Sequence, residues 1–181
     1  HLLIGTEGGN GQVSVNDATL RLEAQQGNAG IRLGMRWTDT EDIVGDGALN
    51  VTNSGLVEIS GSSSGGLWVG GRAGSSGSVS ITDGSALNFT GAGNNLIQIG
   101  AVPREDTGGG GQGELVVTGS EINGARAMLV GYNNATGQVL IDGGSTVALA
   151  GNAGNPSAFL GVGVPSDVTL NGGTGMATLD G

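Results

Sequence analysis

Leu2-Leu3-Ile4-Gly5 is the stretch that decides the fold, because the same motif returns five more times along the chain. The later copies are Ile31-Arg32-Leu33-Gly34, Leu67-Trp68-Val69-Gly70, Ile97-Gln98-Ile99-Gly100, Met128-Leu129-Val130-Gly131 and Leu160-Gly161-Val162-Gly163. Each copy places two apolar positions on either side of one variable residue and then ends on glycine. This pattern predicts a β-strand with one buried face, followed by a residue that turns at positive φ.

The spacing of the motif indicates a repeat architecture. The closing glycines lie at positions 5, 34, 70, 100, 131 and 163, so successive copies are 29, 36, 30, 31 and 32 residues apart. Repeats of this period are typical of solenoids, in which each repeat forms one coil and packs only on its neighbours.

A second strand follows each first motif after a turn. Its pattern is Gly-x-apolar-x-apolar in residues 11–15, 47–51, 77–81, 113–117 and 137–141, and residues 166–170 repeat it without the glycine. Apolar residues that alternate with Ser, Asn and Thr predict a strand with one solvent-exposed face.

A third apolar pair follows a polar turn such as Thr82-Asp83-Gly84-Ser85. The pairs are Leu20/Leu22, Val57/Ile59, Leu87/Phe89 and Val147/Leu149. The fourth repeat keeps only Ile122, and in the sixth the pattern fits either Met176 or the pair Ala177/Leu179. Three strands per coil are therefore expected.

The predicted fold is an all-β, right-handed parallel β-helix of about six three-stranded coils, forming a single domain over residues 1–181 without capping elements. The expected coils are residues 2–30, 31–66, 67–95, 96–127, 128–158 and 159–181. Stacking of the coils places equivalent apolar residues above one another in two inward-facing ladders. One ladder contains Leu2, Ile31, Leu67, Ile97, Met128 and Leu160, and the other contains Val15, Val51, Ile81, Val117, Ile141 and Leu170.

Composition narrows the class of partner. The chain has 40 glycines, no cysteine and a formal net charge of −10, and all six of its basic residues are arginines. An acidic chain without a basic cluster repels phosphate backbones and anionic lipid, so we expect neither nucleic acid binding nor membrane-surface binding. No apolar run reaches the roughly 18 residues of a membrane-spanning helix, so we expect no membrane insertion.

Two long, charged connections distinguish coils two and four. They span residues 35–46 and 101–112 and are expected to leave the same edge of the rod. Because long loops on a rigid scaffold often bind ligands, we predict a ligand or partner edge there. Its candidate residues are Trp37, Trp68, Arg32, Arg36, Arg104 and Tyr132. In the other interpretation, Trp68 only covers the base of the long loop.

The first long loop also contains a candidate calcium site. Asp39, Glu41, Asp42 and Asp46 lie close together in sequence, and their carboxylates are the hard oxygen ligands that Ca²⁺ prefers. The simpler interpretation is a solvated acidic loop beside Arg36. No other cofactor is expected.

Catalytic residues are scarce. The outward middle positions of the second strand are Ser14, Asn50, Ser80, Val116, Leu140 and Thr169, which offer no carboxylate pair for acid–base chemistry. On the third strand, Arg21 and Glu58 fall on adjacent coils, where we expect an exposed salt bridge. We therefore expect no enzyme.

The repeat L-x-I-G, a loop, G-x-V-x-V, a T-D-G-S-like turn and L-x-L resembles the repeats of autotransporter passenger domains and related secreted bacterial β-helix adhesins. The resemblance implies an extracellular or cell-surface location and a structural or adhesive role with a glycan or cell-surface partner. The alternative is a carbohydrate-binding or polysaccharide-degrading β-helix. Since neither end is expected to be capped, we expect a segment of a longer rod or a subunit that stacks end to end into a filament.

Overall fold

The fold is a stack of parallel strands arranged in three sheets. The computed structural model describes residues 1–6, 8–34, 45–71, 73–101, 111–132, 134–151, 158–163, 166–170 and 176–180. In this part of the chain, strands recur in a period of three, so that every third strand enters the same sheet. The part described contains no helix, and hence none able to cross a membrane.

Each sheet collects one strand from every coil. Sheet A contains β1 (Leu2–Ile4), β4 (Asn28–Leu33), β7 (Ser64–Val69), β10 (Leu96–Ala101), β13 (Ala127–Tyr132) and β16 (Phe159–Val162). Sheet B contains β2 (Asn10–Asn16), β5 (Asp46–Thr52), β8 (Ser76–Thr82), β11 (Gln112–Thr118), β14 (Thr136–Asp142) and β17 (Asp167–Leu170). Sheet C contains β3 (Thr19–Ala24), β6 (Leu56–Gly61), β9 (Ala86–Phe89), β12 (Glu121–Ala125), β15 (Thr146–Ala150) and β18 (Met176–Asp180).

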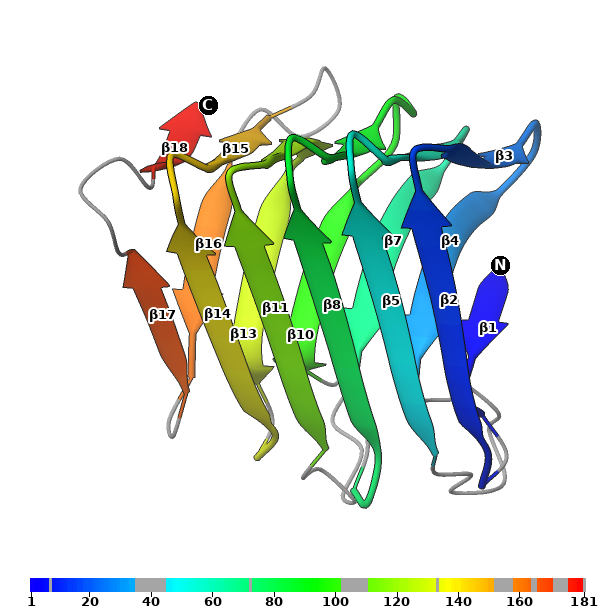
Figure 1. The fold of residues 1–181 in the computed structure, drawn as a ribbon, viewed down its shortest axis with the longest axis vertical. Coiled ribbons are helices and arrows are strands. Elements are labelled where there is room, and N and C mark those ends of the chain that lie inside the picture. Colours follow the sequence, from blue (N-terminus) through cyan, green and yellow to red (C-terminus); the bar gives the residue numbers. More distant parts are fainter. Residues whose placement is uncertain are drawn as a thin grey trace.

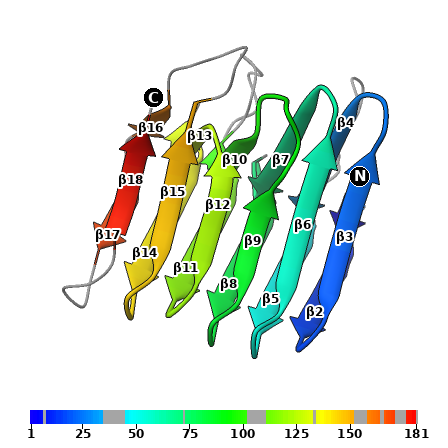
Figure 2. The ribbon, with the colours of Figure 1, turned by 90° about the horizontal axis from the view of Figure 1, so that it is seen from above.

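Every neighbouring pair of strands within a sheet is parallel, which confirms the predicted parallel β-helix of six three-stranded coils. Sheet B lies in front of sheet A in Figure 1, and sheet C faces the viewer in Figure 2. The first coil and the last coil lie at opposite ends of the stack (Figure 1).

The predicted ladders form in the predicted register. Ile31 pairs with Leu2 on one side and with Leu67 on the other, and the ladder continues through Ile97 and Met128. The second ladder on sheet B has the same order, and the middle coils bury both ladders completely. Apolar burial along the axis is therefore the main stabilising term of the rod.

The third strand of coil four differs from the simple pattern. Ile122 is buried as predicted, and Ala125 fills a second inward position, because the register shifts between the two residues. Gly124 has a φ of +77°, a conformation that favours glycine and lets the strand bulge. In coil six the register pairs Val147 with Ala177 and Leu149 with Leu179, which decides between the two alternatives left by the sequence.

Five of the six glycines that close the first strand turn as predicted. Positive φ values are found at Gly5, Gly34, Gly70, Gly100 and Gly131, whereas Gly163 does not adopt one. These residues also pack against the next coil, since a Cβ on Gly70 would overlap the carbonyl oxygen of Gln112, and one on Gly34 would overlap that of Ser76. The glycine column therefore sets both the turn and the close approach of successive coils.

Buried serines line the corner between sheets B and C. Ser85, Ser120 and Ser145 occupy equivalent positions in coils three, four and five, and each is at most 3% exposed. The Ser85 backbone N–H donates to Ser120 Oγ, and the Ser120 N–H donates to Ser145 Oγ, both at 3.2 Å. Among the described residues Ser85 Oγ has no hydrogen-bond partner.

This difference predicts unequal effects of two matched substitutions. Ser145→Ala removes the acceptor of the Ser120 N–H and should lower the free energy of unfolding by about 1–2 kcal/mol. Ser85→Ala removes a hydroxyl without a partner in the described part of the chain and should change it by less than about 0.5 kcal/mol. Urea denaturation followed by circular dichroism measures both. An equal loss in the two variants would contradict a role for the hydrogen bonds.

Two further polar contacts are specific to particular coils. Arg21 and Glu58 form the predicted salt bridge between coils one and two, with Nη2 and Oε2 2.6 Å apart. Asn95 is 4% exposed, accepts the Gly65 N–H at 3.0 Å and donates to the carbonyl oxygens of Gly91 and Gly124 at 3.1 Å. Buried amides of this kind are stable only when their hydrogen bonds are satisfied.

Candidate functional site

The outer faces of the three sheets differ in chemistry. On sheet A, the outward column that includes Arg32 continues through Trp68, Gln98 and Leu129. On sheet B the outward positions near the start of each strand carry mostly amides and hydroxyls. The two faces therefore offer different surfaces to a partner.

Trp68 is nearly buried although it points away from the core. The indole lies over Gly30 and Gly66, where any Cβ would collide with the ring, and the residue is 8% exposed. The Arg32 guanidinium lies 5.0 Å from the ring centroid, and the His1 ring meets it edge-on at 5.8 Å. Desolvation lowers the pKa of Arg32 below its ordinary value. The structure thus brings two of the predicted edge residues together in a packed stack that leaves the indole little free surface.

Tyr132, another predicted edge residue, lies apart from this stack. Tyr132 is 51% exposed at the end of β13, and β10 lies between that strand and β7, which carries Trp68. Trp37, Arg36 and Arg104 lie outside the described residues. The proposed ligand edge therefore stays a prediction.

The calcium prediction also stays untested. Asp39, Glu41 and Asp42 lie outside the described residues, while Asp46 opens β5. Ser76 Oγ donates to Asp46 Oδ1 at 2.5 Å, so this carboxylate is engaged with the next coil. Within the described ranges, no group of three or more His, Asp or Glu side chains is arranged to hold a metal ion.

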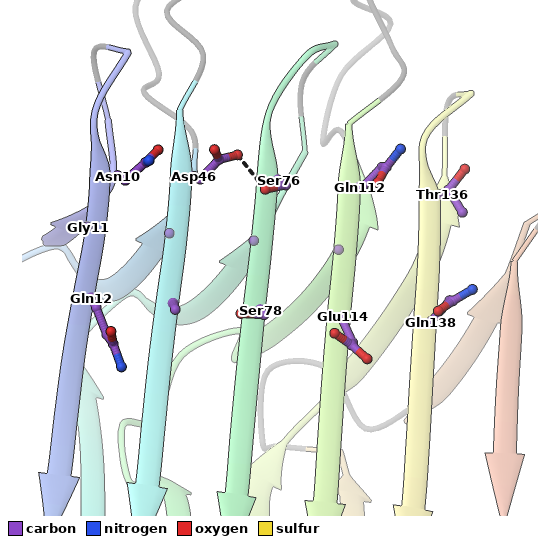
Figure 3. Close-up of a pocket in the computed structure, with 14 residues that line it drawn as sticks. Asn10, Gly11, Gln12, Asp46, Ser76, Ser78, Gln112, Glu114, Thr136 and Gln138 are labelled. Atoms are coloured by element: carbon purple, nitrogen blue, oxygen red, sulfur yellow. Dashed lines mark hydrogen bonds between the residues drawn. The ribbon is translucent and has the colours of Figure 1, made fainter.

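A groove crosses the outer face of sheet B and is a candidate site. It has a volume of about 700 Å³ and is lined by five successive strands, β2, β5, β8, β11 and β14. We call it the sheet B groove. Figure 3 shows the lining side chains projecting from this face in two rows, one from the first residue of each strand and one from the third.

Strand register defines the two rows. Row one contains Asn10, Asp46, Ser76, Gln112 and Thr136, and row two contains Gln12, Ala48, Ser78, Glu114 and Gln138. Neighbouring strands are about 4.8 Å apart, so each row runs along the rod axis for about 19 Å over the five coils. The rows are separated by two residues along each strand, or about 7 Å.

Side-chain size explains why this part of the face is hollow. Coils two and three contribute small residues, Ala48, Ser76 and Ser78, which are half-buried. The flanking coils contribute longer, exposed side chains, such as Gln12 on one side and Gln112 and Glu114 on the other. The small residues form the floor and the longer side chains form the two ends of the groove.

Most polar groups of the groove are available to a ligand. Among the lining side chains, the hydrogen bond between Ser76 and Asp46 is the only one found within the described part of the chain. The side-chain amides of Gln12, Gln112 and Gln138 each offer hydrogen-bond donors and an acceptor. Such groups are suited to bind an uncharged hydrogen-bonding ligand.

Two carboxylates line the groove. Asp46 and Glu114 lie in different rows two coils apart. Sheet geometry places their Cα atoms about 12 Å apart.

The groove was not predicted from the sequence, although the sequence contains a signal for it. A polar residue precedes the strand glycine in five coils, as in Asn10-Gly11 and Gln112-Gly113. Aligning the coils on these glycines gives the strand register, and the polar residues that precede the glycines then fall in row one. The outward positions that were considered, such as Ser80, lie farther along the same strands.

No protein-family model matches the chain, and neither the curated proteins nor the solved structures contain a significant match to it.

Proposed function

We propose that this protein is a non-enzymatic structural and adhesive β-solenoid that acts outside the cell or on a bacterial cell surface. The observation that carries the proposal is the sheet B groove, which presents amide and hydroxyl groups from coils one, three, four and five in register on a hydrogen-bonded rod. A rigid sheet holds these groups at fixed spacing, so a partner binds with little ordering of the protein. The repeat pattern adds support, because it resembles the repeats of autotransporter passenger domains.

The rod also has a structural role in this proposal. Strands β1, β2 and β3 form one edge of the three sheets, and β16, β17 and β18 form the other. Edge strands pair readily with further strands of the same direction. We propose that these edge strands pair with a second copy of this chain stacked end to end, or with further coils.

Electron microscopy of the purified chain over a concentration series tests the structural part. Six coils at about 4.8 Å each predict filaments with an axial repeat of about 29 Å. Short rods of constant mass at every concentration would contradict end-to-end stacking.

A second experiment tests the adhesive part. Beads coated with the chain should adhere to cell surfaces, and the chain should release no reducing ends from soluble polysaccharides. Steady release of reducing ends would contradict a non-enzymatic role and would support the polysaccharide-degrading alternative.

A further inference from the structure

We propose that the sheet B groove binds a linear, uncharged polysaccharide whose chain runs parallel to the rod axis. This inference rests on the proposed adhesive function and names the partner class of the groove. The direction of the two rows, the chemistry of the lining side chains and their charge support this proposal.

Because the rows run along the rod axis, they favour an extended ligand. Both rows cross the strands and repeat once per coil, so equivalent positions, occupied by different side chains, recur about every 4.8 Å along the axis. A compact ligand would use only one or two coils. A linear polymer with a repeating unit contacts all five coils that line the groove.

The polar side chains that line the groove favour a ligand rich in hydroxyl groups. Amide side chains both donate and accept hydrogen bonds, and so do the serine and threonine hydroxyls of the floor and row one. Sugar hydroxyls have the same dual capacity. The methyl group of Ala48 provides a small apolar patch on which the C–H face of a sugar ring can lie.

The charge of the groove disfavours anionic polymers. Among the described residues that line it, the titratable groups are Asp46 and Glu114 and none is an arginine, and the whole chain carries a formal net charge of −10. A uronate or sulfate polymer would meet like charge along the groove. A neutral polysaccharide carries no charge to be repelled, and its hydroxyl groups can donate hydrogen bonds to each carboxylate.

The described residues that line the groove include no aromatic side chain, and this predicts how affinity depends on the length of the ligand. Most contacts are hydrogen bonds that compete with water, so a single sugar unit binds weakly. Affinity therefore grows with chain length until the oligosaccharide spans the five coils, and then becomes constant.

Affinity electrophoresis in gels that contain a mixed-linkage β-glucan, a galactomannan or polygalacturonate tests the inference. The full chain should be retarded by at least one of the two neutral polymers and not by polygalacturonate. Retardation by polygalacturonate alone, or by none of the three polymers, would overturn the inference.

Two matched variants locate the binding site. Ser78→Leu fills the floor of the groove and should weaken binding at least about tenfold. Ser80→Leu makes the same change two residues farther along β8, on the same outer face but outside the groove lining, and should leave the affinity within about twofold. Equal weakening in both variants would overturn the assignment of the groove.

A third variant addresses the amides without filling the groove. The double substitution Gln112→Ala/Gln138→Ala removes two exposed amides and should also weaken binding at least about tenfold while the denaturation midpoint stays unchanged. Unchanged affinity in this variant would show that the rows do not make the contacts.

The results separate failure of this inference from failure of the proposed function. If coated beads adhere to cells but no neutral polymer binds, the groove assignment is wrong and the adhesive function stands. If neutral polymers bind and are cleaved, the groove assignment stands and the non-enzymatic function is wrong.

Discussion

Gly70→Ala is expected to lower the free energy of unfolding by about 3 kcal/mol. Gly70 has a φ of +59°, which costs an alanine about 1 kcal/mol or more. Its new Cβ would also overlap the Gln112 carbonyl oxygen, which belongs to the backbone of the next coil and cannot move without separating the coils. Overpacking of this kind adds about 1–3 kcal/mol. Urea denaturation monitored by circular dichroism measures the loss.

Gly84→Ala is the matched control. Gly84 has a similar φ of +72°, but the nearest atom to its added Cβ is Ser54 Oγ at 3.8 Å, which is ordinary contact. This variant should lose only the conformational cost, about 1 kcal/mol. If both variants lose the same amount, close approach of the coils at the glycine column does not contribute to stability.

Leu67→Ala is expected to cost about 3–4 kcal/mol. Leu67 is completely buried, and its strand pairs on both sides, with Ile31 and Ile97 as its neighbours in the ladder. Truncation removes apolar contacts and leaves a cavity between two coils that the parallel strands hold at fixed spacing. Denaturation midpoints of the variant and the unmodified chain give the difference.

Leu160→Ala provides the comparison within the same ladder. Leu160 pairs with Met128 on one side and is only half-buried, so the same truncation should cost about 1 kcal/mol. A solenoid gains its stability from contacts between nearest neighbours, and the two variants test this directly. Equal costs would mean that the coils unfold without regard to position in the stack.

The fold could be predicted from the sequence because the apolar pairs repeat at a fixed place in each coil. The ladder through Ile31 and Leu67 follows from that spacing alone, and the register agrees with it. The bulge at Gly124 could not be predicted, because an extra residue in one strand leaves no trace in the period of its neighbours. The buried role of Asn95 was also missed, since a polar residue outside the apolar pattern suggests a surface loop.

The candidate site was harder to predict than the fold. Trp68 occupies the predicted outward position, but its burial depends on Gly30 and Gly66, which let the ring lie flat on the sheet. The sheet B groove arises from the contrast between small residues in two coils and long residues in the next, as at Ser78 and Glu114. Such a contrast has meaning only after the strands are aligned.

Because the coils are similar, one coil could pair with the wrong partner during folding. The coil-specific polar contacts disfavour such mispairing. If coil one paired with coil three, Leu2 would still meet Leu67, so the apolar ladder alone does not tell a neighbour from the coil beyond it. The same error would leave Glu58 without Arg21. A comparable error farther along would leave the Asn95 amide buried without the groups of Gly65 and Gly124. Contacts that add little to native stability can thus raise the free energy of mispaired chains and so select the correct neighbour.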